Sequence, residues 1–254
     1  MALLEVKNLT KHFGGLTAVG DVTMELNEGE LVGLIGPNGA GKTTLFNLLT
    51  GVYEPSEGTV TLDGTLLNGK KPYTIASLGL SRTFQNIRLF KDMTVLDNVL
   101  LGMSNTNKSH FLSSVLRLPK FYASEDKLRQ KAIELLAIFG LDGNADNLAK
   151  NLPYGQQRRL EIVRALATQP KILFLDEPAA GMNPQETAEL TALIRQVKEQ
   201  FGITIILIEH DMSLVMEVTE RIYVLEYGRL IAHGTPDEIK NDKRVIEAYL
   251  GGDV

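Results

Sequence analysis

Gly36-Pro37-Asn38-Gly39-Ala40-Gly41-Lys42-Thr43 fits the phosphate-loop pattern G-x-x-x-x-G-K-S/T, and Thr44 follows it directly. The apolar run 31–35 before it reads as a buried strand, and 43–49 reads as a helix. The glycines allow a tight turn whose backbone N–H groups converge on an anion, and the helix N-terminus adds partial positive charge there. Lys42 is placed to reach the outer phosphates of a nucleotide, and the Thr43 hydroxyl to ligate Mg²⁺. The stretch predicts a binding site for a nucleoside triphosphate.

Composition narrows the classes of protein to consider. The 254 residues allow one large or two small domains, and a formal net charge of -5 argues against a protein that coats nucleic acid. The absence of cysteine excludes disulfides, thiol catalysis and cysteine zinc sites. No apolar run approaches the roughly 18 residues of a membrane span, and the first residues turn polar too early for a signal peptide. We therefore expect a cytoplasmic protein whose membrane role, if any, comes through a partner.

The hydrophobic pattern predicts an α/β fold with an inserted helical part. Segments 3–9 and 22–26 alternate like half-buried strands, and a turn at Phe13-Gly14-Gly15 separates them. Beyond residue 165, short apolar runs alternate with helical patterns, which indicates a parallel sheet covered on both faces. We predict a P-loop NTPase (RecA-like) core with an antiparallel β subdomain, formed by residues 1–89 and 161–254. Residues 90–160 form a helical subdomain.

Three finer expectations accompany this fold. The polar stretch 104–124 reads as an insertion with a short amphipathic helix around 111–116. Residues 228–234 read as a terminal hairpin or meander. Residues 237–250 read as one closing helix.

Acidic residues follow one of the predicted parallel strands. Asp176 and Glu177 end the apolar run 172–175, as in a second nucleotide-binding motif. Ligands of open α/β sheets bind beyond the C-terminal ends of the strands, so both carboxylates are expected to face the phosphates. Asp176 suits a Mg²⁺ ligand, directly or through water. Glu177 suits the group that orients and polarises the attacking water.

His210 and Gln85 also follow candidate strands. We expect His210 to hydrogen-bond the terminal phosphate and Gln85 to meet both the Mg²⁺ shell and the attacking water. Each has a plainer interpretation, as a structural histidine and a solvated glutamine. Phe13 also admits two interpretations: a small-core residue, which its position favours, or a ring on which an adenine base stacks. The other histidines are interpreted as surface residues: His12, His110 and His233.

The motifs, taken in order, resemble those of ABC-transporter ATPase subunits. They are GPNGAGKTT, the glutamine of RTFQ, LPYGQQRRLEIVRAL, ILFLDEP and the histidine of IEHD, and they span nearly the whole chain. The resemblance implies two ATPase subunits that dock head to tail with two ATP molecules between them. Each phosphate loop then faces the signature helix of the other subunit. The residues of the signature are Leu152, Pro153, Tyr154, Gly155 and Gln156.

The resemblance also assigns roles that spacing alone did not. It places Phe13 at the adenine-stacking position, Gln85 in the loop that couples to membrane domains, and Asn183 in a loop exchanged between subunits. Two features depart from the family pattern. Pro153 and Tyr154 stand where Ser and Gly are usual, which removes a hydroxyl at the γ-phosphate. Asn183 stands in place of Asp, so hydrogen bonding remains and a charge is lost.

A narrower resemblance is to the ATPases of branched-chain amino-acid importers, and within them to the larger of the two. It is carried by RTFQNIRLFKDMTVLDNVLLG, the polar insertion, YGQQRRLEI and EPAAGMNP. This implies a second ATPase subunit, identical or different, two membrane permeases and an extracytoplasmic substrate-binding protein, with no nucleic acid. It also implies a place on the cytoplasmic face of a prokaryotic inner or plasma membrane, reached through the permeases. The transported substrate would be an amino acid that this chain does not touch.

Other functions remain open on the sequence. They are the ATPase of another ABC system, such as a lipid or lipopolysaccharide exporter, and a soluble ABC ATPase acting on nucleic acid or the ribosome. A nucleotide-sensing module is disfavoured by the presence of Glu177 and His210. Coupling to permeases is predicted at a cleft between the core and the helical subdomain, beside residues 85–92. There Phe90 is expected to be an exposed anchor, while Ile87 and Leu89 serve the core or the interface equally well.

Overall fold

A computed structural model describes residues 2–104 and 119–250, with the side chains of 119–124 and of residue 250 left aside. The chain forms two compact units. Residues 1–82 and 171–254 make the core unit, and 83–170 make the helical unit. These bounds differ from the expected ones at 89/90 and 160/161. A division at 160 would cut helix α6 (Tyr154–Leu166), which is continuous.

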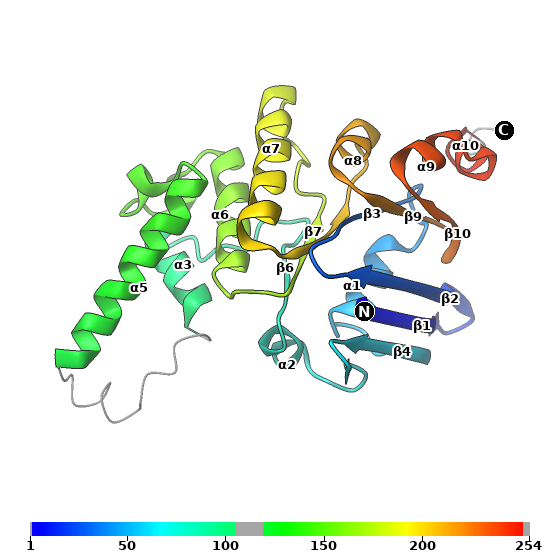
Figure 1. Ribbon diagram of the computed structural model, residues 1–254, viewed down its shortest axis with the longest axis horizontal. Helices are drawn as coiled ribbons and strands as arrows, with labels where there is room; N and C mark the ends of the chain where they lie inside the picture. The colour runs from blue at the N-terminus through cyan, green and yellow to red at the C-terminus, as the bar shows by residue number, and fades with distance from the viewer. Residues whose placement is uncertain (1, 105–118, 251–254) are drawn as a thin grey trace. The chain divides into compact units, whose positions relative to one another are not determined.

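A six-stranded sheet forms the centre of the core unit, in the order β10-β9-β3-β8-β7-β6 (Figure 1). The neighbours from β9 to β6 are parallel, and β10 pairs antiparallel with β9. Every residue of β3, β7 and β8 is buried, as expected for strands covered on both faces. The strands are β3 (Leu31–Ile35), β6 (Leu80–Arg82), β7 (Ile172–Asp176), β8 (Thr204–Ile208), β9 (Arg221–Glu226) and β10 (Arg229–Gly234).

A four-stranded antiparallel sheet, β2-β1-β4-β5, belongs to the same unit. Its first two strands are longer than the alternation predicted, because they continue to the turn at Gly14, whose φ is 58°. Buried residues alternate with exposed ones along β2, so one face of the hairpin packs on the core. The strands are β1 (Ala2–Phe13), β2 (Leu16–Asn27), β4 (Glu57–Leu62) and β5 (Thr65–Leu66).

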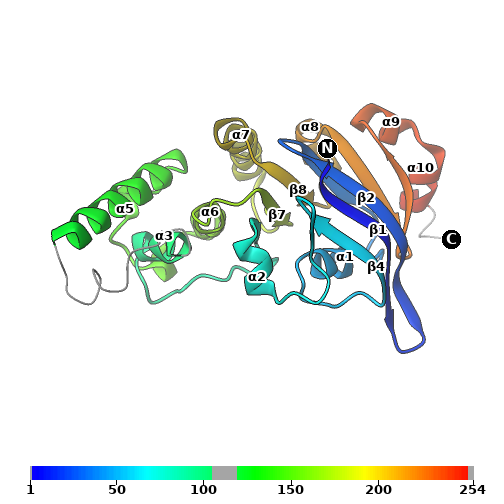
Figure 2. The same ribbon diagram turned by 60° about the horizontal axis from the view of Figure 1, so that its bottom comes forward.

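Helix α1 (Lys42–Leu49) lies between the two sheets (Figure 2). Its Phe46 meets Phe174 of β7 edge to face, with ring centroids 4.9 Å apart, inside a core shared by both sheets. The opposite face of the large sheet is covered by α8, α9 and α10, where Val215 and Ile239 pack with Ile35. The other helices of this unit are α2 (Pro72–Ser77), α7 (Pro184–Phe201), α8 (Met212–Val218), α9 (Pro236–Asn241) and α10 (Lys243–Leu250).

The expected single helix at 237–250 is therefore wrong. The backbone of Asp242 is extended, with ψ 118°, and this residue separates α9 from α10. Its carboxylate accepts a hydrogen bond of 2.9 Å from the N–H of Arg244. An aspartate that bonds a backbone N–H two residues on favours a break over a continuing helix.

The helical unit packs α3 (Val95–Met103), α5 (Pro119–Ile138) and α6 around buried Leu96, Val99 and Leu160. Two short 3₁₀ turns, Asp142–Asn144 and Ala149–Asn151, connect α5 to α6. The amphipathic helix expected around 111–116 lies outside the described residues. Among the helices described, none combines the length and the apolar character needed to cross a bilayer.

Candidate functional site

The phosphate loop connects β3 to α1, and two of its glycines are required by their surroundings. A Cβ on Gly36 would lie 2.0 Å from the carbonyl oxygen of Leu225, and one on Gly41 would lie 2.6 Å from that of Ala18. Both residues have positive φ, 154° and 99°, which disfavours any side chain. The loop is therefore packed closely against neighbouring backbone, and its conformation is fixed by those contacts.

Lys42 is buried at the first position of α1 and bends back over the loop. Its Nζ donates to the carbonyl oxygens of Gly36 (2.6 Å) and Pro37 (3.0 Å). Burial lowers the pKa of the ammonium, while the nearby carboxylates of Glu177 and Asp176 act to raise it. The predicted lysine and the two predicted carboxylates thus lie together. Thr43, the next residue of the helix after Lys42, is exposed.

Asp176 is held by an arginine that the sequence analysis did not single out. The Asp176 carboxylate is buried, and its Oδ2 accepts from Arg82 Nη2 at 2.6 Å. Arg82 also donates from Nη1 to Asn47 Oδ1, at 2.6 Å, so it joins the ends of β6 and β7 to helix α1. The sequence signal for Arg82 was its position as a charged residue at the end of a strand. That position does not indicate which residue Arg82 pairs with.

Glu177 and His210 form the hydrogen bond that brings the two predicted catalytic residues together. His210 Nε2 lies 2.6 Å from Glu177 Oε1, and the glutamate side chain is 12% exposed while that of His210 is 47% exposed. Glu177 has φ 47°, in the left-handed region, where a non-glycine residue costs about 1–2 kcal/mol. Its N–H donates to the carbonyl of Ile208 on the next strand, at 2.9 Å. A strained residue that carries a predicted catalytic carboxylate is typical of a functional site.

Glu209, one residue before His210, was also missed. It is 5% exposed, and burial raises the pKa of its carboxyl, although two backbone N–H groups oppose the rise. Its oxygens accept from Ala179 N, at 2.8 Å, and from His210 N, at 3.1 Å. Glu209 therefore ties the loop after Glu177 to the backbone of His210.

Phe13 is exposed, so the interpretation that its position favoured, a core residue, is wrong. Its side chain is 43% exposed and meets Tyr53 edge to face at 5.3 Å. Lys11 Nζ lies 5.2 Å from the centre of the Phe13 ring. The adenine-stacking role that the family resemblance implied for this exposed ring stays a prediction.

The other residues predicted in the core unit are an asparagine and two histidines. Asn183 is the N-cap of α7: its side chain accepts from Glu186 N, and the Glu186 carboxylate accepts from Asn183 N, both at 3.0 Å. Although Asn183 lacks the charge of the aspartate usual at this position, it still forms a complete capping box with Glu186. His12 and His233 are exposed, as interpreted, and His110 lies outside the described residues.

The helical unit carries Gln85 and the signature residues 152–156. Gln85 is exposed and lies three residues beyond β6, which ends at Arg82, so the candidate strand reaching Gln85 is too long. Pro153 is the N-cap of α6 and supplies no side-chain cap. Leu152 and Gly155 are buried, whereas Tyr154 is 48% exposed. The N–H groups of the first turn remain as donors at the start of this helix.

Pro153→Ser tests whether those backbone donors suffice. A serine N-cap is expected to stabilise the start of α6 by about 1 kcal/mol. Because its hydroxyl would then serve the helix, we expect ATP turnover to stay within about threefold, well below the gain from a full hydrogen bond to a charged group. Turnover and unfolding temperature are to be measured beside Pro72→Ser, a proline at the start of α2. A large rise in turnover would mean that the backbone donors of this helix alone bind the γ-phosphate too weakly.

The donors at the phosphate loop suit a magnesium–nucleotide complex. Within residues 2–104 and 119–250, no three His, Asp or Glu side chains gather as a metal site would require. Mg²⁺ normally takes one or two protein ligands and completes its shell with phosphate oxygens and water. Thr43, exposed at the start of α1, and Asp176, at the end of β7, match that need. Gln85, the third predicted ligand, belongs to the helical unit.

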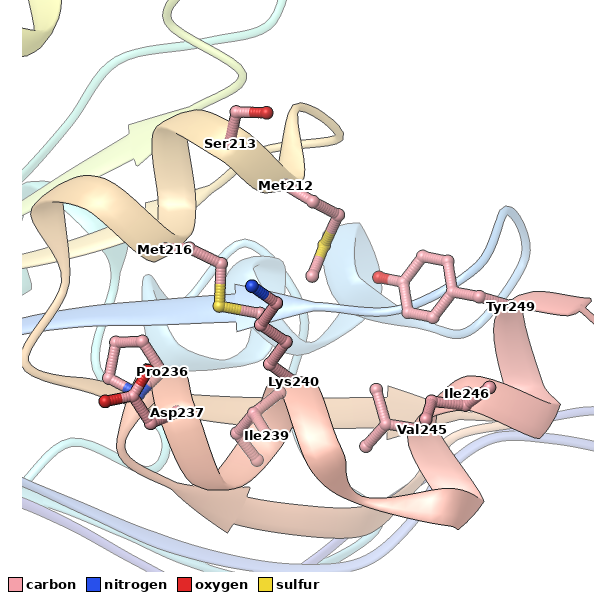
Figure 3. Close-up of a pocket in the computed structure, with 10 residues that line it drawn as sticks. All are labelled: Met212, Ser213, Met216, Pro236, Asp237, Ile239, Lys240, Val245, Ile246 and Tyr249. Atoms are coloured by element: carbon pink, nitrogen blue, oxygen red, sulfur yellow. The ribbon is translucent and has the colours of Figure 1, made fainter.

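An apolar pocket of about 590 Å³ lies between α8, α9 and α10 (Figure 3). Met212 and Met216 of α8 line it, together with Ile239 of α9. Tyr249 of α10 also lines it; the backbone N–H of Gly36 donates to the Tyr249 hydroxyl, whose pKa burial raises. The last helix described therefore contacts the first glycine of the phosphate loop, which the sequence did not predict.

Comparison with known proteins gives the family. The family model for ABC transporters matches residues 19–180, and the model for branched-chain amino acid ATP-binding cassette transporters matches residues 229–254. The high-affinity branched-chain amino acid transport ATP-binding protein LivG of Salmonella typhimurium is 51% identical over 249 residues, 98% of each chain.

Two solved structures agree with this match. The ADP conformation of an ATP-binding cassette of an ABC transporter has a TM-score of 0.84 at 33% identity and covers 99% of both chains. A dimeric cassette in a post-hydrolysis state, bound to ADP and phosphate, has a TM-score of 0.78 at 26% identity, covering 92% of this chain and 98% of that one. Similarity of this extent means that the chain belongs to the ABC-transporter family and is one of its ATP-binding cassettes.

Proposed function

We propose that the chain binds and hydrolyses ATP to power an importer of branched-chain amino acids. The observation that carries the hydrolytic part is the Glu177–His210 hydrogen bond beside a buried lysine. The transport part rests on full-length similarity to a branched-chain transport ATP-binding protein. In this proposal the chain works on the cytoplasmic face of a prokaryotic membrane, attached through permeases.

The residues divide the work at the nucleotide. The N–H groups of the phosphate loop and Lys42 hold the phosphates, while the exposed Phe13 receives the adenine. Thr43 and Asp176 hold Mg²⁺, which would neutralise charge on the phosphates. Arg82 fixes the Asp176 carboxylate through their 2.6 Å ion pair. Glu177 then orients the attacking water, and the 2.6 Å contact with His210 holds the glutamate side chain in place.

A second ATPase subunit completes each site. The exposed start of α6, with Pro153 and Tyr154, supplies backbone donors to the nucleotide of the other subunit. Two permeases and an extracytoplasmic binding protein complete the transporter. Purified chain, partner ATPase and permeases in vesicles should take up radiolabelled leucine only when ATP and the binding protein are present. Uptake of a lipid instead, or ATPase activity stimulated by nucleic acid, would favour one of the other functions.

Phe90 is the proposed anchor for a permease. Its side chain is 52% exposed, and the Arg164 guanidinium lies 5.4 Å from the centre of its ring. Its backbone is rigidly held, because buried Asn98 accepts from Phe90 N (3.0 Å) and donates to Phe90 O (3.1 Å). An exposed aromatic ring on a fixed backbone, bordered by charge, has the character of an interface hot spot. Ile87 and Leu89 are half-buried, so both serve the packing of the helical unit in part.

Phe90→Ala is expected to weaken assembly with the permeases by about 2 kcal/mol or more, the loss typical of a hot spot. ATP binding to the isolated subunit should not change, because the phosphate loop belongs to the other unit. Co-purification with the permeases and leucine uptake are the measurements. Phe201→Ala is a suitable control, since that phenylalanine is 41% exposed at the end of α7. Normal assembly and uptake in the Phe90 variant would remove this residue from the interface.

A further inference from the structure

Helix α6 contains a buried ion pair that has no part in the proposed binding and hydrolysis of ATP. The side chains of Arg158 and Glu161 are 0% and 1% exposed, and Arg158 Nη1 lies 3.1 Å from Glu161 Oε2. Burial of two charges carries a desolvation cost that must be offset by the pair and by further hydrogen bonds. The groups that accept or donate those further hydrogen bonds therefore show which part of the chain the ion pair keeps in position.

Most of those bonds reach the backbone of residues 84–88, which is neither helix nor strand. Arg158 donates from Nη1 to the carbonyl oxygen of Phe84 and from Nη2 to that of Gln85, both at 2.7 Å. Glu161 Oε1 accepts from the N–H of Arg88 at 3.0 Å. A longer bond of 3.4 Å joins Arg158 to the Tyr154 hydroxyl. The planar guanidinium fork thus holds two successive carbonyls, and the carboxylate holds an N–H three residues later.

We propose that Arg158 and Glu161 are positioning residues that make the segment 84–88, which ends two residues before Phe90, move together with helix α6. The inference rests on the proposed function, in which the start of α6 meets the nucleotide of a second subunit and Phe90 meets a permease. Arg158 lies about one helical turn beyond Tyr154, at that start. A displacement of α6 on ATP binding is therefore transmitted by Arg158 to the main chain of Gln85 and by Glu161 to that of Arg88. The pair connects nucleotide binding to the permease contact and touches neither ligand.

The test removes this link and keeps the fold. Replacing a buried ion pair with apolar residues of similar volume is often neutral or stabilising, whereas removing one partner leaves a buried charge uncompensated. The variant is thus Arg158→Met combined with Glu161→Leu, assembled into the whole transporter. Its KM for ATP is expected to match that of the wild type, whereas its unfolding temperature is expected to fall modestly because three backbone groups lose their partners. Leucine uptake per ATP hydrolysed is expected to fall about tenfold, within the range for residues that transmit coupling.

A matched control exists on the core unit. Arg195 Nη1 and Glu217 Oε1 form an ion pair at 3.1 Å whose side chains are 43% and 58% exposed. Arg195→Met with Glu217→Leu makes the same chemical change away from the segment, and uptake per ATP should stay at the wild-type value. A tenfold loss in this control as well would show that charge removal alone explains the result, and would overturn the inference.

Arg158→Lys and amide exchange decide the case if the apolar pair does not fold. Lysine keeps the positive charge beside Glu161 but cannot present a planar fork to two carbonyls, so uptake per ATP should fall at unchanged KM. In the wild-type protein the Arg88 amide should exchange as slowly as amides inside α6, and faster in Arg158→Lys.

Besides a loss in the control, two further results would overturn the inference. They are wild-type coupling in a folded apolar-pair variant, and rapid exchange of the Arg88 amide in the wild type. Failure of the proposed function is a separate result, because then the wild-type assembly itself takes up no leucine. The exchange measurement still tests the link in that case.

Discussion

Glu177→Gln is expected to lower ATP turnover by about 10²–10⁴-fold, the usual contribution of a positioned base, and to leave ATP binding intact. The amide has nearly the shape of the carboxylate, so the 2.6 Å contact with His210 Nε2 can persist. It cannot polarise water as the carboxylate does. The substitution also removes one of the two negative charges near Lys42, so affinity for the phosphates should not decrease. With hydrolysis blocked, ATP should hold two subunits together.

The measurements are phosphate release, ATP binding by calorimetry and dimer formation by size-exclusion chromatography with ATP. Glu199→Gln makes the same chemical change on the exposed surface of α7 and should behave as the wild type. An unchanged turnover in Glu177→Gln would remove this residue from the catalytic role. If both turnover and ATP binding were lost, the left-handed turn at Glu177 would have a mainly structural purpose.

Local signals in the sequence predicted most of the core unit. The strands β3, β7 and β8 are continuous apolar runs, and each is followed by a polar or glycine-rich turn, so their parallel arrangement and the site at their ends followed from pattern alone. The loop 36–43 was also predicted from a local pattern, the phosphate-loop motif between a strand and a helix. The motif specifies glycine at positions 36 and 41, and the structure shows that a side chain at either position would collide with neighbouring backbone.

The features that were missed depend on contacts between distant parts of the chain. Arg82 and Asp176 are 94 residues apart, and Arg158 and Gln85 are 73 apart, so no periodicity indicates either bond. The exposure of Phe13 was set by how β1 and β2 extend beyond the core, which the alternation did not show. The family resemblance supplied the prediction that Phe13 stacks on adenine, because a family pattern carries tertiary information that a single sequence lacks.

Lys42→Ala is expected to weaken ATP binding itself, in contrast to the effect at Glu177. The buried ammonium lies near the carboxylates of Asp176 and Glu177, so its removal takes away a positive charge beside both, and Arg82 remains as the cation paired with Asp176. One hydrogen bond to a charged group contributes about 1.5–3 kcal/mol, which corresponds to a rise in Kd of about 10- to 150-fold. The bonds from Nζ to the carbonyls of Gly36 and Pro37 are lost as well, so the loop also becomes less ordered.

Calorimetry with ATP and the unfolding temperature without nucleotide separate these two effects of Lys42→Ala. If lost charge dominates, Kd rises steeply while the unfolding temperature stays within a few degrees of wild type, and Lys42→Met gives the same Kd. If loop order dominates, methionine, which fills the buried space, should restore part of the affinity. Lys71→Ala is the control, because this exposed lysine precedes α2 and carries the same charge. An ATP affinity in Lys42→Ala equal to that of this control would contradict the phosphate-binding role, because a buried cation beside two carboxylates would then serve the fold alone.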